Sequence, residues 1–208
     1  MPLDAIYLSA LSRELSSALV GGKIEKVQQP ERDTVLLSVR SNYENHKLLI
    51  SAGTGRARIH LTKQVYPNPT EPPMFCMLLR KHLVGAKIAA MTQPENERML
   101  RIELISRDEL GFESDKTLIV ELIGRSSNIA LLDADGRIID CMRRMDFAGS
   151  AERCMLPGMI YRLPPVQAKP ALLKTDGAMR AEMIYNAEKN RTADKWLLDN
   201  VSGVSPLV

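Results

Sequence analysis

The sequence has few of the residues from which disulfide frameworks and metal sites are built. It contains three cysteines, Cys76, Cys141 and Cys154, and three histidines, with no CxxC pair and no Cys/His ligand spacing. Zinc sites need closely spaced ligand pairs, and an odd number of distant cysteines does not form a disulfide framework. We therefore expect no disulfide, no metal and no cofactor, with the thiols acting as small core residues in a reducing compartment.

The common enzyme motifs are also missing. The chain has no GxxxxGK[ST] or GxGxxG phosphate loop, and His46, His60 and His82 are too scattered for a Ser/His/Asp or Cys/His arrangement to be read from their spacing. Gly53-Thr54-Gly55 is a lone turn. These absences argue against an NTPase, a nucleotide-dependent dehydrogenase and a metalloenzyme.

Long apolar runs are absent as well. No stretch approaches the ~18 apolar residues that cross a bilayer, and the first residues lack the basic and apolar regions of a signal peptide. We expect a cytoplasmic protein with no membrane partner. The chain of 208 residues is 45% hydrophobic, which is sufficient for a core, and its net charge is only +3. A small net charge does not identify a polyanionic partner, because the clustering of the charges matters more.

Helical and strand-like patterns alternate along the chain. Four leucines at helical spacing follow Asp4, a plausible N-cap, and Gly21-Gly22 ends this first helix. A proline-rich connection at 66–73 leads into a second helix at 74–83. Strands are expected near 34–40, 46–51, 56–62, 87–92, 97–105, 117–123 and 128–133 and again from 137, and the chain beyond Pro170 has helical composition. The pattern predicts an α+β fold with mainly antiparallel strands.

Three groups of basic residues are candidates for contact with phosphates. Arg56, Arg58 and His60 project from one face of a strand, and Arg80, Lys81 and His82 follow one another on the second helix. A third group contains Arg143, Arg144 and Arg153. From the residues alone, a solvated surface is the more common explanation for each group.

The dipeptide Glu97-Arg98 is more informative. Arg98 shares the parity of Leu100, Ile102 and Leu104, which form the more apolar face of their strand. An arginine on that side needs a partner, which is either a buried carboxylate or a phosphate or base at the rim of the sheet. The alternatives remain open here, as does the reading of Asp4 as a helix cap.

Five stretches spread along the chain form a recognisable series: LDAIYLSALSREL, PPMFCMLLRKHL, QPENERMLRIEL, ELIGRSSNIALLDADGRIID and LPGMIYRLPP. In this order they resemble the N-terminal domain of the NFACT family of ribosome-associated quality-control factors, which includes bacterial proteins once called fibronectin-binding protein A. The tail at 194–208 is similar to the start of the family's helix-hairpin-helix domain. The resemblance implies an NFACT N-terminal domain at 1–170 and a truncated helix-hairpin-helix domain at 171–208.

The resemblance also implies a function. Family members bind large ribosomal subunits obstructed by peptidyl-tRNA and recruit tRNA, which in bacteria is alanyl-tRNA, while the ribosome itself forms the peptide bond. The acidic residue of the family's first helix falls on Asp4, and its Asp-Arg pair falls on Glu97-Arg98, with Glu in place of Asp. The RNA-backbone candidates are Arg56, Arg58, Arg80, Lys81, His82, Arg125, Arg143 and Arg144.

The family fold is similar to the N-terminal domain of formamidopyrimidine-DNA glycosylases, a β-sandwich flanked by helices. This similarity supplies a rival hypothesis, an enzyme that uses Pro2 as its nucleophile. However, Leu3 stands where those enzymes have a glutamate, and no zinc-finger motif is present. A second rival hypothesis is a fibronectin-binding surface adhesin. The missing signal peptide and the unpaired cysteines argue against it.

Overall fold

The computed structural model describes residues 3–107, 111–146, 153–165, 169–171, 175–187 and 190–204. Pro2 lies outside these residues. In the described part, the strands are β1 (Lys23–Glu31), β2 (Thr34–Ser41), β3 (Glu44–Ser51), β4 (Arg58–Leu61), β5 (Lys87–Thr92), β6 (Met99–Arg107), β7 (Glu113–Glu121), β8 (Asn128–Leu132) and β9 (Ile138–Cys141). The helices are α1 (Ala5–Leu19), α2 (Met74–Leu83), the short 3₁₀ helix η1 (Gly124–Ser126), α3 (Gly177–Tyr185) and α4 (Ala193–Asn200).

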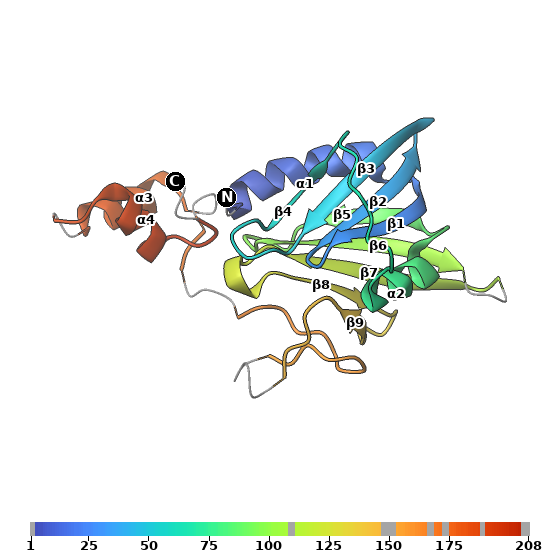
Figure 1. Cartoon of the computed structure of the whole chain (residues 1–208). Helices are drawn as coiled ribbons and strands as arrows, with labels where there is room; N and C mark the ends of the chain where they lie inside the picture. The colour runs from blue at the N-terminus through green and yellow to red at the C-terminus, as the bar shows by residue number, and fades with distance from the viewer. Residues whose placement is uncertain are drawn as a thin grey trace.

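The strands form one antiparallel sheet in the order β4-β3-β2-β1-β5-β6-β7-β8-β9 (Figure 1). Its two halves join between β1 and β5, where only Lys23 and Lys87 are paired in register. Apolar side chains from both halves belong to a single core cluster, so the halves pack face to face. Helix α1 packs against β2, β4, β5 and β6, and α2 packs against β1, β6 and β9. The predicted mixed fold with a large antiparallel sheet is therefore confirmed, while the similarity to the glycosylase domain stays a prediction.

The first helix forms as its sequence predicts. Leu8, Leu15 and Leu19 are fully buried, and Asp4 caps the helix by accepting a hydrogen bond from the backbone N–H of Tyr7 at 2.7 Å. After the helix, a Cβ on Gly22 would lie 2.8 Å from side-chain atoms of β2, so only glycine allows this close approach. The apolar stripe and both ends of α1 were thus readable from the sequence.

Several strand boundaries differ from the prediction, and two of these differences have a clear structural cause. β6 begins at Met99 rather than 97, because the N–H of Glu97 donates to the carbonyl of Pro94 and Asn96 adopts a positive φ of 57°, which makes a turn there. β7 runs from Glu113 to Glu121, although its first half is polar. Pairing with β6 through to Arg107 holds that polar half in the sheet, and pairing of this kind is not visible in local sequence.

A second, smaller apolar cluster lies on the outer face of β6–β9. Its buried members are Met99, Ile119, Ala130, Leu132, Ile138, Cys141 and Met155. The segment 153–161 covers this face and is held by bridges from Met155 to Met145 and from Ile160 to Arg137. One half of the sheet is therefore covered on both faces.

Helices α3 and α4 lie beyond Pro170, as the composition predicts. The described C-terminal residues return to the start of the chain, where the N–H of Ala5 donates to the carbonyl of Gly203 at 2.7 Å. None of the described helices is long and apolar enough to span a lipid bilayer. The division into domains at 170 stays a prediction.

Candidate functional site

One glutamine joins the start of α1 to the loop that carries Glu97 and Arg98. The Gln93 side-chain amide donates to the carbonyls of Ala5 and Glu97, each at 2.9 Å. Asp4 is the residue immediately before Ala5, so the fold brings all three residues expected from the family resemblance to one end of the molecule. Asp4 is far in sequence from the adjacent pair Glu97 and Arg98, and tertiary contacts alone bring it to them.

Arg98 is half-buried at the entrance to β6. Its carbonyl accepts a hydrogen bond from the N–H of Leu122 at 2.8 Å. Its guanidinium makes no ion pair or side-chain hydrogen bond with another residue that the structure describes. Burial raises the pKa of the neighbouring Glu97, and the positive charge of Arg98 partly opposes that rise. Of the two alternatives for Arg98, an internal carboxylate partner is not the one found in the described structure.

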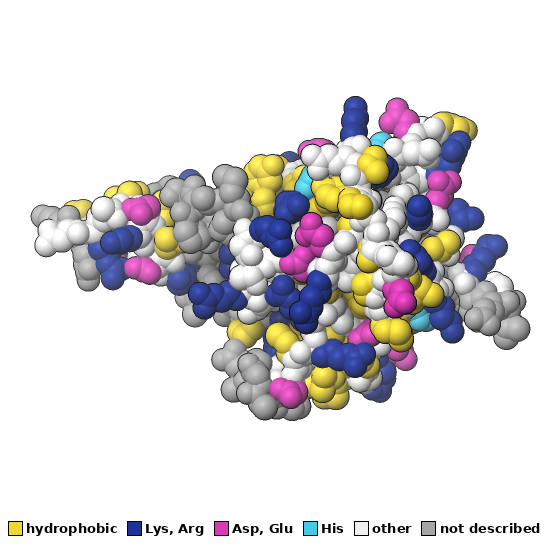
Figure 2. Space-filling model, in the orientation of Figure 1, with side chains coloured by type: hydrophobic (Ala, Val, Ile, Leu, Met, Phe, Trp, Pro, Cys, Tyr) yellow, Lys and Arg dark blue, Asp and Glu magenta, His cyan; other side chains and the backbone are white. Residues whose placement is uncertain are grey.

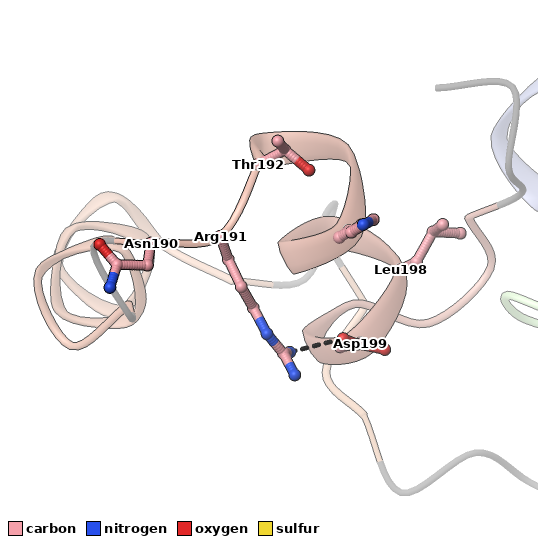
Figure 3. A pocket seen from close by; sticks show the side chains of 6 residues that line it. Asn190, Arg191, Thr192, Leu198 and Asp199 are labelled. Carbon is pink, nitrogen blue, oxygen red and sulfur yellow. Dashed lines mark hydrogen bonds and ion pairs between the residues drawn. The ribbon is translucent and has the colours of Figure 1, made fainter.

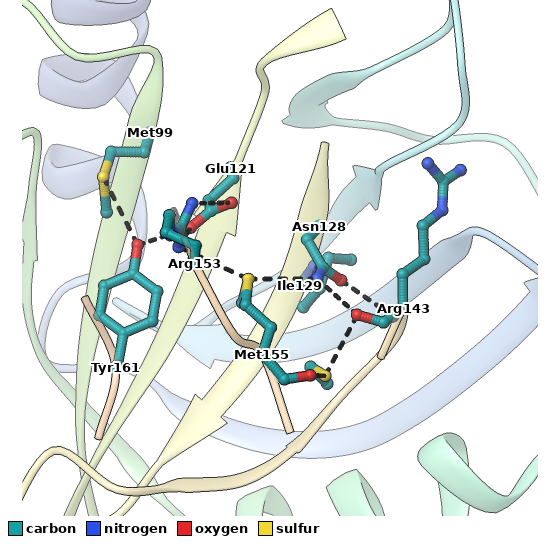
Figure 4. A network of polar contacts seen from close by, with 9 residues as sticks. Met99, Glu121, Asn128, Ile129, Arg143, Arg153, Met155 and Tyr161 are labelled. Carbon is teal, nitrogen blue, oxygen red and sulfur yellow. Dashed lines mark hydrogen bonds and ion pairs between the residues drawn. The ribbon is translucent and has the colours of Figure 1, made fainter. Parts of the chain in front are cut away.

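The buried acid of this region is Glu121, and its cationic partner is Arg153 (Figure 4). Arg153 donates to both carboxylate oxygens, at 2.6 and 3.3 Å, and the hydroxyl of Tyr161 donates to the same carboxylate at 2.6 Å. Glu121 is fully buried and Arg153 is 8% exposed. Burial and the adjacent Glu121 raise the pKa of Tyr161, which keeps its hydroxyl protonated as a donor.

The inclusion of Arg153 among the residues able to neutralise phosphates was wrong. Arg153 is part of the covering segment, and its guanidinium is buried against Glu121, which would otherwise be an unpaired buried charge. Sequence reasoning also missed Glu121 and Tyr161. The available signal was a single glutamate within the apolar run Leu118–Leu122, which demands a buried partner.

Two further arginines lie at the same end as Arg98. η1 follows directly after Leu122, which is bonded to Arg98, so Arg125 is close by in the fold. Arg143 approaches it, with its guanidinium 3.4 Å from the carbonyl of Arg125. The side chain of Asn128 fixes the backbone of Arg143 by bonding to both its carbonyl and its N–H, at 2.8 and 3.0 Å. No ion pair with a described acid neutralises either arginine.

We call the residues Asp4, Glu97, Arg98, Arg125 and Arg143 the Arg98 end. Figure 2 shows Lys and Arg side chains gathered near the N-terminal end of α1, with acidic side chains among them. Arg144, by contrast, is engaged, because its guanidinium bonds to both oxygens of Asp140 at 3.2 and 3.3 Å.

Arg56 and Arg58 line a hollow of about 370 Å³ beside the start of α1, together with Tyr7 and apolar side chains. Ala57 and Ile59 are buried while Arg58 and His60 are partly exposed, as predicted, but β4 begins at Arg58, so Arg56 lies in the preceding turn and not on the strand. Arg56 is partly neutralised, since its guanidinium lies 3.9 Å from acids of β1 and the following turn. Burial, reinforced by Arg58, lowers the pKa of His60, which keeps that ring neutral.

The basic group on α2 lies elsewhere. The Arg80 guanidinium donates to the carbonyl of Val27 at 2.9 Å, which is a structural contact. His82 has a lowered pKa, first because of burial and then because of Lys116, which pairs with Leu104 near the far end of β6. At about 3.4 Å per strand residue, that position is roughly 20 Å from Arg98. The fold therefore separates the α2 group from the Arg98 end.

The described residues contain no group of three His, Cys, Asp or Glu side chains that could hold a metal ion. Burial, followed by Asp140, raises the pKa of the Cys141 thiol to about 12, so it remains protonated as an inert core residue. A separate open hollow of about 510 Å³ lies against α4, where Arg191 and Asp199 form an ion pair of 2.5 Å (Figure 3).

Comparison with known proteins assigns the chain and its fold to one family. The family model for the NFACT N-terminal and middle domains matches residues 4–208. The chain therefore belongs to the NFACT family, as its motifs indicate.

Individual proteins of this family are similar to the chain in sequence. The chain is 39% identical over 210 residues to the Rqc2 homolog RqcH of Bacillus subtilis, which covers all of this chain and 36% of that protein. It is 30% identical over 140 residues to the ribosome quality control complex subunit NEMF of Homo sapiens, covering 67% of this chain and 12% of that protein. The chain thus spans about a third of the bacterial relative.

Solved structures show the same fold. The N-terminal domain of the fibronectin-binding protein PavA from Streptococcus pneumoniae matches with a TM-score of 0.86 and 33% identity, over 98% of this chain and 79% of that one. The N-terminal part of the fibronectin/fibrinogen-binding protein from Streptococcus suis matches with a TM-score of 0.88 and 34% identity, over 98% and 75% of the two chains.

Proposed function

We propose that this chain is the RNA-binding N-terminal part of a ribosome-associated quality-control factor. In this proposal the whole protein acts in the cytoplasm on large ribosomal subunits obstructed by peptidyl-tRNA. It recruits tRNA, alanyl-tRNA in bacteria, for messenger-independent tailing of the stalled chain. Its relatives are named as ribosome quality-control proteins, which supports this class of function.

The observation that carries the proposal is that the Arg98 guanidinium forms no ion pair within the described residues. Arg98 lies at the end of the molecule that also holds Asp4, Glu97 and Arg125, and its charge acts on Glu97 only through space. An unneutralised guanidinium at the rim of a sheet is suited to a phosphate or a base edge, both of which it can bind with two parallel hydrogen bonds. The factor positions tRNA by such contacts, and the ribosome forms the bond.

Glu97 stands where the family pattern has aspartate, and we assign it a positioning role. Its carbonyl is held by Gln93, and its raised pKa reflects a carboxylate partly withdrawn from water. The side chain is one methylene longer than aspartate, so it reaches the same ligand group only by a different rotamer. Glu97→Asp, which restores the family's acid, is expected to bind tRNA at least as well as the parent chain.

Replacing Arg98 by alanine in the intact protein tests the proposal. We expect tRNA affinity to fall about tenfold or more, because a hydrogen bond to a charged group contributes roughly 1.5–3 kcal/mol. The melting temperature should hardly change, since no described partner is left unpaired. Arg107→Ala is the matched control, because Arg107 ends the same strand far from Arg98 and, among the described residues, forms its ion pair with exposed Glu113. Equal tRNA affinity for both variants and the parent would remove Arg98 from the site.

The adhesin hypothesis predicts a different result for the same variants. Fibronectin and fibrinogen binding are named for the two streptococcal proteins and are not carried over to this chain. If the parent chain bound immobilised fibronectin and failed to bind tRNA or large subunits, the RNA proposal would be abandoned in favour of the adhesin.

A further inference from the structure

Five cations lie on the outer face of β1, β2, β3 and β5, away from the residues considered above. Lys23 is directly opposite Arg40 on β2 and Lys87 on β5. Residues directly opposite in an antiparallel pair point to the same side of the sheet, with Cβ atoms about 4.5–5.5 Å apart. The structure thus places three positive charges side by side in one row across three adjacent strands.

A second row lies alongside the first. Ser38 of β2 is opposite Lys26 on β1 and Lys47 on β3, and it is two residues from Arg40, so it faces the same way. The inward-facing neighbours of these strands, Val39 and Ile24, are fully buried, which confirms that the cations point outward. We call Lys23, Lys26, Arg40, Lys47 and Lys87 the cationic face.

The charges of the cationic face are not neutralised by the described part of the chain. None of the five cations has an ion pair there, although like charges directly opposite one another destabilise a sheet. Glu25 and Glu44 are the acids nearest in sequence. Glu25 is exposed without an ion pair in the described structure, and Glu44 lies 3.8 Å from His46. The adjacent positive charges do not stabilise the fold, whereas they are suited to binding a polyanionic ligand.

A second observation on the same region indicates a ligand. The β2–β3 hairpin turns through Asn42 and Tyr43, both with positive φ, at 49° and 65°. Such turns favour Asn-Gly, because a side chain at the second position is strained. Tyr43 is nonetheless 96% exposed, so the strain is not offset by packing within the chain. Backbone positions held in sparsely populated conformations are concentrated at active sites, ligand clamps and switch regions.

We propose that the cationic face is a second RNA-binding surface, which takes the backbone of a structured RNA helix while the Arg98 end contacts tRNA. This inference rests on the proposed RNA-binding function and extends it. Two parallel rows of cations suit the regularly spaced phosphates of A-form RNA, which proteins recognise by shape and backbone rather than by base edges. Figure 2 shows Lys and Arg side chains spread over the end of the molecule where β1 and β2 lie.

The two surfaces are far enough apart to contact different RNA segments. The Arg98 end lies at the start of α1, and Lys23 follows shortly after its last residue, Leu19. A helix of 15 residues is about 22 Å long at 1.5 Å per residue. One chain therefore presents two separated contacts, which fixes the orientation of a large RNA assembly better than one contact does.

The test is binding of a 20-base-pair RNA duplex, measured as a function of salt, by the chain carrying Lys23→Ala, Arg40→Ala and Lys87→Ala. Each phosphate contact contributes about 0.7–0.9 to the slope of log affinity against log salt. We expect the slope to fall by about 2–3 in the triple variant. Its melting temperature should be equal to or above that of the parent, because repulsion is removed, so unfolding does not explain the loss.

A matched triple variant removes the same charge elsewhere. Arg32, Arg162 and Lys195 are all exposed and lie outside the cationic face, and their replacement by alanine should leave most of the slope intact. An equal fall in both triple variants would overturn the proposal, because net charge alone would then explain binding. An unchanged slope in the first triple variant would overturn it as well.

The Arg98→Ala variant separates this inference from the proposed function. It should retain duplex binding while losing tRNA affinity, whereas the first triple variant should lose duplex binding. If Arg98→Ala left tRNA binding unchanged and the triple variant still lost the duplex, only the proposed role of Arg98 would fail. If the parent chain bound vesicles containing phosphatidylserine but no RNA duplex, the cationic face would be a lipid-binding surface and the inference would be wrong.

Discussion

The outer faces of the two halves of the sheet differ in whether their cationic side chains are neutralised by acids of the same chain. On β6–β9, segment 153–161 packs over the sheet, and its Arg153 is bonded to the buried acid Glu121. On β1, β2 and β5, three cations stand in a row, exposed and without an ion pair in the described structure. Arg153 is therefore a structural residue, because its segment is packed against the sheet, whereas the row of three cations remains available to a ligand.

The largest effect is expected where the charge is buried. Arg153→Met leaves the fully buried carboxylate of Glu121 without its cation, and we expect the free energy of unfolding to fall by about 3–5 kcal/mol. Chemical denaturation measures this loss. Arg144→Met is the control, because its ion pair with Asp140 has an exposed guanidinium and should cost no more than about 1 kcal/mol. Similar losses in the two variants would contradict the distinction between the faces.

A smaller effect is expected from the hydroxyl in the same buried network. Tyr161→Phe keeps the aromatic ring, whose centroid lies 5.3 Å from the Arg153 guanidinium, but removes the 2.6 Å hydrogen bond to Glu121. We expect a loss of about 1.5–3 kcal/mol, which is typical of a hydrogen bond to a charged group. Tyr66→Phe, on the more exposed side of the molecule, should lie within about 0.5 kcal/mol of the parent. No measurable change in Tyr161→Phe would mean that the network is not held by this bond.

The smallest effect, with the opposite sign, is expected on the cationic face. Lys23→Gln removes the central charge of its row, so the free energy of unfolding should rise by about 0.3 kcal/mol at low salt. The gain should disappear near 1 M salt, where charges are screened within about 3 Å. Lys63→Gln, exposed but outside the row, should show no such gain. A loss of stability in Lys23→Gln would show that this lysine has a stabilising partner in the fold.

The difference between neutralised and unneutralised cations also explains how much of the candidate site was predictable from the sequence. The sequence indicated Asp4 and Arg98 through family motifs, and the parity of the strand flagged Arg98 as needing a partner. It also placed Arg153 with the surface arginines, which was wrong. Local patterns cannot reveal that Arg153 contacts Glu121. Glu121 ends β7 and Arg153 begins segment 153–161, and the two residues meet only when that segment packs onto the sheet.

Strand boundaries are also only partly predictable from local sequence, because some depend on contacts with neighbouring strands. The bounds of α2 and β5 agree with their apolar periodicity. The polar first half of β7 has no strand pattern of its own and is held by its ladder with β6. Cross-strand neighbours decide such segments, because strand propensity depends on context more than helix propensity does.

By itself, the sequence determined most of the helices and strands, the antiparallel class and the family, because periodicity, turn residues and motifs are local properties of the chain. Only the tertiary structure decided which charges are neutralised. Gln93 joins Asp4 to Glu97, Arg153 is sealed on Glu121, and Lys23 stands between two other cations. Neutralisation depends on distances between segments that are far apart in sequence, and those distances exist only once the sheet has closed over its core.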